Sequence, residues 1–437
     1  MKKILVISVL LCLTLSVFAA GKAEEGKAAM KKEGTITLWT AYPDIGAVLE
    51  GIGKRYMEAN PGVEVKITVF AARALEDKSN TAIPAGVGPD IVQNDVPSVK
   101  VLIDNGHFSR PPDKLWDFYQ KSIRPVYRQV QRTKDEFWGM PVFSSLKYHF
   151  WNVGWFKEVG LTKAPETLDE MVAYARKLTK YDAAGNVVKS GISLRLSGGG
   201  FGVAEKWWNL ALHPYGGSPQ IPTSSGKFKA GLDSEASQLA VKIYIDMLYK
   251  YKVDSFAVDH DTAAFAKEVT AQFQREGTTI PFMQENAPKV EYGIAPLPGA
   301  KINGCQTGGE TMEVTEKSKN KALAWDFVMY CLEPDYQREL FVKTGWLPVR
   351  EDVDYEPVYK EKPKYKELNT IPDGYQTFVY FSNSAFMELW GKAGAWLTEA
   401  FTKKELMDNP AAIKKSSEDF NKEANEILKE AGQYSAN

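Results

Sequence analysis

The sequence predicts an exported α/β protein with more than one lobe, and three observations lead to this prediction. An apolar run near the N-terminus is followed by a charged stretch, as in a signal peptide. After it, strand-like and helix-like hydrophobic periodicities alternate along the chain. The remaining length, roughly 415 residues, exceeds what one hydrophobic core usually serves, so we expect two lobes of about 150 to 220 residues.

The N-terminus has the three parts of a secretory signal peptide. Lysines at positions 2 and 3 precede an apolar run over residues 4–18, and small residues follow at positions 19–21. A run of about 15 apolar residues is shorter than the roughly 20 that a transmembrane helix needs, although an uncleaved anchor is the alternative. We therefore assign residues 1–21 to a signal peptide and residues 22–33 to a disordered spacer.

Charge and cysteine content exclude some function classes. The formal net charge is −1 and no basic block occurs, which argues against nucleic acid as a partner. Cys12 lies in the signal peptide, so Cys305 and Cys331 remain in the exported chain. These two cysteines either form one bridge or lie unpaired in the core.

The first ordered segment reads as strand, helix, strand. Residues 35–38 alternate as a strand, and apolar residues from Ile45 to Tyr56 then recur at helical spacing before the stop at 60–62. Residues 63–69 alternate again. A further strand at 90–93 and a helix at about 96–105 follow, which favours a parallel sheet.

A second set of elements begins after residues 138–141. We expect a strand at 148–152, a helix opened by a capping box at Thr167, a turn at 181–186 and a strand at 190–196. Longer helices are predicted at about 234–251 and 320–332, and the chain after Asp373 is expected to be helical without sheet. Prolines at 141 and at 296–298 are candidate joints where the chain crosses between lobes, or ordinary loop prolines.

Sequence motifs for catalysis are largely missing. The four histidines are scattered without zinc-ligand spacing, neither a nucleophile elbow nor a phosphate loop occurs, and we interpret the glycine-rich segment 197–202 as a flexible loop. We expect no cofactor and no metal.

Aromatic residues instead lie beside turn residues at the ends of predicted elements, where indole rings can stack on sugars, or else pack in a core. They are Trp39, Tyr42, Trp207, Trp208, Trp346 and Trp390.

Several segments in this order and spacing resemble the family 1 extracellular solute-binding proteins of ABC importers, the maltose-binding-protein-like group. The resemblance extends from about residue 35 to about residue 428. The segments are TITLW at 35–39, YMEANPGV at 56–63, GPDIV at 88–92, WGMPV at 138–142, WN at 151–152, APETLDE at 164–170, YGIAPLP at 292–298 and TGWLPV at 344–349.

The resemblance implies a type II periplasmic-binding-protein fold, in which two lobes, each a mixed sheet flanked by helices, are joined by a hinge. Lobe 1 would comprise residues 34–142 and 293–345, and lobe 2 residues 143–292 and 346–437. It further implies a periplasmic or extracellular monomer that binds a small solute, most simply a mono- or oligosaccharide, without catalysis, and delivers it to importer permease subunits. Non-sugar solutes such as polyamines or polyol phosphates, and a secreted glycosidase, are the alternatives.

Carried over by position, the resemblance implies a set of cleft residues from both lobes. They are Trp39, Tyr42, Asn94, Asp95, Ser144, Ser145, Trp207, Trp208, Glu276, Gly309, Glu310, Trp346 and Trp390. The sequence departs from the maltose-binding pattern at Gln93–Asn94, at Ser145 and at 276–279, so maltose itself is not indicated.

Overall fold

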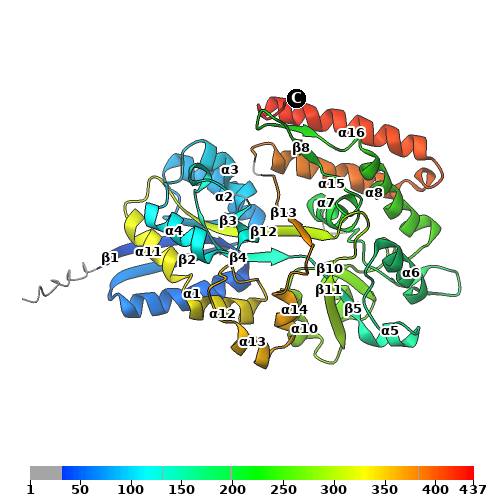
Figure 1. Cartoon of the computed structure of the whole chain (residues 1–437), viewed down its shortest axis with the longest axis horizontal. Helices are drawn as coiled ribbons and strands as arrows, with labels where there is room; N and C mark the ends of the chain where they lie inside the picture. Colours follow the sequence, from blue (N-terminus) through cyan, green and yellow to red (C-terminus); the bar gives the residue numbers. More distant parts are fainter. Residues whose placement is uncertain (1–31, 130, 197–198, 382) are drawn as a thin grey trace, which may run out of the picture.

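The computed structural model describes residues 32–437 apart from positions 130, 197, 198 and 382. The predicted signal peptide, and the predicted spacer up to residue 31, lie outside the described residues. Two lobes lie side by side, one around the N-terminal strands and one around the central and C-terminal helices (Figure 1). Among the described residues, none of the helices combines the length and apolarity that crossing a membrane requires.

A six-stranded mixed sheet forms the centre of the first lobe, in the order β13-β12-β3-β1-β2, with β4 also paired to β12. Strand β1 runs parallel to β2 and β3, whereas β12 runs antiparallel to β3 and β4 and parallel to β13. The strands are β1 (Glu33–Ala41), β2 (Gly62–Phe70), β3 (Ile91–Asp95), β4 (Met140–Leu146), β12 (Gly304–Val314) and β13 (Gln376–Phe378).

The helices around this sheet follow the predicted periodicity. Helix α1 buries the apolar stripe from Ile45 to Tyr56, because positions three and four apart share one face of a helix. The predicted strand-helix-strand unit and the next strand and helix are thus confirmed. The helices of this part are α1 (Pro43–Ala59), α2 (Ala72–Ala85), α3 (Val96–Asp104), α4 (Asp113–Ser122), η1 (Pro125–Arg128), η2 (Lys134–Glu136), α11 (Lys321–Tyr330), α12 (Pro334–Thr344), α13 (Glu356–Glu361) and α14 (Lys364–Leu368).

The second lobe contains a three-stranded antiparallel sheet, β10-β5-β11, and many helices. Its strands are β5 (Tyr148–Asn152), β6 (Lys180–Tyr181), β7 (Val187–Lys189), β8 (Gln220–Pro222), β9 (Phe228–Ala230), β10 (Gln272–Arg275) and β11 (Tyr292–Pro296). Its helices are α5 (Val153–Glu158), α6 (Leu168–Leu178), α7 (Gly200–Trp207), η3 (Trp208–Leu212), α8 (Glu235–Ile245), η4 (Asp246–Lys250), α9 (Asp261–Ala266), α10 (Thr279–Asn286), α15 (Phe386–Thr402), η5 (Lys404–Leu406) and α16 (Pro410–Glu430).

Local sequence signals explain several boundaries in this lobe. The Thr167 hydroxyl accepts a hydrogen bond from the Glu170 amide, as the capping box predicts for the start of α6. Helix α7 approaches α15 so closely that a Cβ on Gly394 would lie 2.1 Å from the backbone of Gly200. The glycine-rich segment therefore serves helix packing from Gly200 onward, and the loop interpretation is wrong there; its first two residues are not among those described.

Two other expectations are corrected. Residues 190–196 are not a strand: Ser190 forms a single bridge to Thr270, and the ladder ends because the Leu194 amide bonds the Asp254 carboxylate and Arg195 has a left-handed φ of 55°. The chain after Asp373 is not sheet-free, because β13 pairs with the start of β12. Such a short strand carries no periodicity of its own, and only its distant partner defines it.

One residue separates the two sheets where the chain first crosses between them. Strand β4 belongs to the six-stranded sheet and β5 to the three-stranded sheet, and only Lys147 lies between them. Pro296 pairs opposite Tyr148 beside this crossing, whereas Pro141 lies inside β4 opposite Thr311. The predicted lobe boundaries remain a proposal. Cys305 and Cys331 are buried and unpaired, so no disulfide joins them.

Glu313 is a buried acid in β12 whose carboxylate oxygens have no hydrogen-bond partner among the described residues. Burial raises its pKa to about 8. The folded state then keeps a proton that the unfolded chain releases near pH 4.5. The stability that depends on this proton is therefore fully present below pH 4.5. It falls as pH rises toward 8, by at most about 1.4 kcal/mol per pH unit.

We predict that Glu313→Gln removes this loss, so that the variant is more stable than the parent at pH 8. Urea unfolding at pH 5, 6.5, 8 and 9 measures the difference. The exposed Glu388→Gln variant is the control. Parallel stability profiles for the parent and Glu313→Gln would contradict the assignment.

Candidate functional site

A cleft of about 110 Å³ is lined by side chains from both lobes. The lining residues come from the ends of β1 and β3, from β4, β12 and the crossing at Lys147, from α7, and from the chain after α12, β10 and β13. The lining residues are Tyr42, Asp95, Val96, Pro97, Ser145, Lys147, Phe201, Glu205, Glu276, Gln306, Thr307, Gly308, Gly309, Glu310, Trp346, Val379 and Tyr380.

The first-lobe wall carries two carboxyl groups on adjacent strands. Asp95 on β3 lies directly opposite Glu310 on β12, in antiparallel register. Gln93 Nε2 donates to Glu310 Oε2 at 3.0 Å, and the Thr40 hydroxyl donates in turn to Gln93 Oε1. Burial raises the pKa of Asp95 and, much further, that of Glu310. Burial therefore favours the protonated, uncharged forms of these two acids.

An aromatic surface adjoins the acids. Tyr42 and Trp346 have ring centroids 5.2 Å apart, and Trp346 Nε1 donates to Asp44 Oδ2 at 3.0 Å, which fixes the indole. Tyr42 has a left-handed φ of 67°, a conformation that costs a non-glycine residue energy and is frequent at functional sites. Phe201 and Tyr380 face the cleft from the second lobe. The cleft thus combines apolar ring faces with hydrogen-bond acceptors.

Lys147, at the crossing, forms the centre of a buried ion network. Its Nζ lies 2.7 Å from Glu205 Oε1 and also contacts Glu276 Oε1. Arg195 pairs with Glu205 at 3.0 Å, and Arg275 with Glu276 at 3.3 Å. Burial alone would lower the pKa of Lys147, but the two carboxylates raise it, and the cations lower the pKa of both acids against the effect of burial. These five groups are therefore charged and mutually satisfied.

The structure brings part of the predicted set together in the cleft: Tyr42, Asp95, Ser145, Glu276, Gly309, Glu310 and Trp346.

The other predicted residues do not line the cleft. Trp207, Trp208 and Trp390 are buried in the core of the second lobe. Trp39 packs on Phe70, at a ring-centroid distance of 5.4 Å. In the sequence these tryptophans lie beside turn residues, as residues of a ligand site do. In the fold they pack against other side chains and do not line the cleft.

Asn94 and Ser144 are also placed elsewhere. Asn94 is buried beside Asp95, and since successive strand residues point to opposite faces, both cannot face the cleft. The Ser144 hydroxyl donates to the carbonyl of Gly308 within the sheet. Both side chains are therefore buried within the protein and do not line the cleft.

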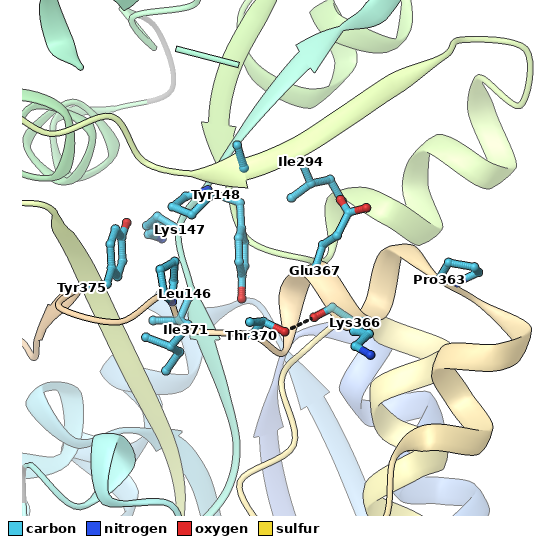
Figure 2. Close-up of a pocket in the computed structure, with 13 residues that line it drawn as sticks. Leu146, Lys147, Tyr148, Ile294, Pro363, Lys366, Glu367, Thr370, Ile371 and Tyr375 are labelled. Atoms are coloured by element: carbon cyan, nitrogen blue, oxygen red, sulfur yellow. Dashed lines mark hydrogen bonds between the residues drawn. The ribbon is translucent and has the colours of Figure 1, made fainter. Parts of the chain in front are cut away.

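A larger cavity, of about 430 Å³, also adjoins the crossing (Figure 2). Tyr148, Ile294, Ile371 and Tyr375 give it a mostly apolar lining, and Lys147 borders both cavities. Strands β4, β5 and β11 and the segment around α14 enclose it. Convergent acids and fixed aromatic rings occur in the smaller cleft, which we therefore take as the candidate site.

A family model for bacterial extracellular solute-binding proteins matches residues 51–367, which is most of the chain. The chain belongs to this family. A binding protein of Brucella abortus is 24% identical to this solute-binding protein over 359 residues, 77% of this chain and 80% of the relative. The maltotriose-binding protein of Pyrococcus abyssi is 20% identical over 396 residues, 89% of this chain and 82% of the relative.

The fold of this solute-binding protein also occurs in solved structures. An ABC transporter solute-binding protein from Thermotoga lettingae, bound with α-D-tagatose, aligns with a TM-score of 0.74 at 20% identity. The alignment covers 91% of this chain and 100% of that one. The predicted two-lobed fold is therefore confirmed.

Sequence reasoning missed several lining residues of this solute-binding protein. Lys147 had a usable signal, because it is the single Lys, Arg, Asp or Glu in residues 140–152. Glu205 was only one of many carboxylates, and Phe201, Gln306 and Tyr380 carried no local pattern. The fold alone brings these residues to one place.

We predict that Lys147→Met destabilises the protein by about 3 to 5 kcal/mol at pH 7, because two buried carboxylates lose the cation that they share and each keeps only one arginine partner among the described residues. Urea unfolding measures the change. Lys157→Met is the matched control: it removes an exposed ion pair with Glu291, which contributes about 0 to 1 kcal/mol. Equal stabilities of the two variants would contradict the central role of Lys147.

Proposed function

We propose that this chain is the exported carbohydrate-binding component of an ABC importer. The observation that carries the proposal is the cleft itself, where the rings of Tyr42 and Trp346 adjoin carboxyl and amide oxygens. A sugar has apolar C–H faces that stack on such rings and hydroxyl groups that donate to such acceptors. The maltotriose and tagatose of the compared proteins support the same class of solute.

Closure of the lobes would retain the solute. The Arg73 guanidinium, on α2, lies 4.3 Å from the ring centroid of Phe201, on α7, and helix α3 contacts α15. These contacts join elements on opposite sides of the cleft, and they would be lost in an open form. A solute that touches both walls favours the closed form by its differential affinity, and the permease subunits would recognise that form.

The chain is proposed to act outside the cytoplasm as a monomer that binds without catalysis. The family description, extracellular solute-binding protein, supports an exported protein. A glycosidase also needs paired carboxyl groups, so the decisive distinction is chemical: a binding protein releases its sugar unchanged.

The test is a screen of mono- and oligosaccharides, polyamines, amino acids and polyol phosphates against the chain without residues 1–21. We predict that one saccharide class raises the melting temperature and is recovered intact. A ligand at 100 times its Kd adds about 2.7 kcal/mol to stability. Stabilisation by a non-saccharide only would overturn the carbohydrate assignment, and release of cleaved sugar would overturn the binding role.

We further predict that Tyr42→Ala weakens binding of that saccharide by about tenfold or more, because a stacking surface is lost. Isothermal titration calorimetry measures the change. Tyr181→Ala removes an exposed tyrosine outside the cleft and should bind like the parent. If both variants bind equally well, the ligand lies elsewhere.

A further inference from the structure

The cleft contains two kinds of carboxyl groups that differ in their partners. Glu205 and Glu276 are neutralised by Lys147, Arg195 and Arg275. Asp95 and Glu310 form no ion pair among the described residues, although they face each other across neighbouring strands. Opposed side chains of an antiparallel pair have Cβ atoms about 5 Å apart. The described residues therefore include a close pair of acids, Glu310 buried and Asp95 half-buried, to which they supply no ion-pair partner.

Arg73, the basic side chain that acts on Asp95, does not supply this partner. Arg73 influences Asp95, but its guanidinium pairs with Glu76 at 2.6 Å and lies over Phe201. The other large electrostatic interactions of the acid pair involve acids and phenols. They are Tyr42, Glu76, Glu313 and Tyr380.

The buried side-chain oxygen atoms of the cleft residues that lack a hydrogen-bond partner among the described residues are all acceptors. Among the lining residues, Asp95 Oδ1 and Gln306 Oε1 are buried without a hydrogen-bond partner in the described part of the chain. Gln306 is only 4% exposed, so solvent does not readily satisfy it. Both atoms are acceptors, and a buried acceptor without a donor costs about 1 to 3 kcal/mol. The bound solute must therefore present hydrogen-bond donors here.

We propose that the solute is an aminated carbohydrate whose ammonium group binds between Asp95 and Glu310. This inference rests on the proposed carbohydrate-binding function and names its substrate class. A hydroxyl group supplies donors but no charge, whereas an ammonium supplies three donors and the missing cation. The rings of Tyr42, Phe201 and Trp346 also favour a cation, which their π faces attract.

Proton exchange distinguishes an ammonium from a hydroxyl. Burial raises the pKa of both Asp95 and Glu310 and so favours their protonated forms, whereas an ammonium between them would favour their ionised forms. Binding of an aminated sugar should release protons and strengthen as pH rises from 5 to 7, while the amine stays charged. Binding of a neutral sugar should not strengthen over this range.

The experiment is calorimetric titration of the chain without residues 1–21. The probes are glucosamine, galactosamine, mannosamine and glucosamine oligomers, each beside its N-acetylated and its hydroxyl counterpart. We expect an aminated member to bind at least about tenfold tighter than both counterparts at pH 7. The counterparts lack the ammonium group that would pair with Asp95 and Glu310, and loss of one partner of a buried charge pair weakens binding by at least about tenfold. Buffers of different ionisation enthalpy should report the released proton.

Conservative variants locate the effect. Asp95→Asn and Glu310→Gln keep the shape of each side chain, and each should reduce the preference for the amine by about tenfold or more. Glu388→Gln, exposed on α15, should leave it unchanged. If aminated and neutral sugars bind equally, or if the preference survives both variants, the amine assignment is overturned and the carbohydrate function stands. If no saccharide binds, both fail.

Discussion

A buried lysine at a chain crossing is the constraint on which the rest of the cleft depends. Lys147 is the single residue between a strand of the large sheet and a strand of the small one, and its ammonium group contacts both Glu205 and Glu276. Burying three charges costs several kcal/mol per ion unless each finds partners. Arg195, Arg275 and the Tyr380 hydroxyl complete those partners, so the crossing, α7 and the chain after β10 are fixed together.

Around this network the backbone is strained at Tyr42 in the cleft, at Arg195, which pairs with the cleft residue Glu205, and at Asp261, which pairs with Arg195. Tyr42, Arg195 and Asp261 all have positive φ angles, and Arg195 joins Asp261 to Glu205. Such conformations cost about 1 to 3 kcal/mol each and persist where surrounding contacts impose them. Contacts of the side chains thus hold the backbone in unfavourable conformations beside the cleft. Side chains fixed in this way are typical of a preorganised binding site.

Sequence patterns predicted the scaffold better than the site, for physical reasons. The first strand-helix-strand unit was readable because half-buried elements show their periodicity locally. Tyr42 was readable because it follows a strand, whereas Asp95 entered the predicted set through the family resemblance. Trp208 and Trp390 were misplaced because an indole suits a core and a sugar equally well. Glu205 and β13 were missed because their partners are distant in the sequence.

The most direct test of this account is a crystal structure of the chain with the saccharide that stabilises it most. We expect a sugar ring against Tyr42 and Trp346, with donors directed at Asp95, Glu310 and Gln306. Density for the saccharide in the apolar cavity beyond Lys147, bordered by Tyr148 and Ile371, or on the surface with the cleft empty, would contradict it.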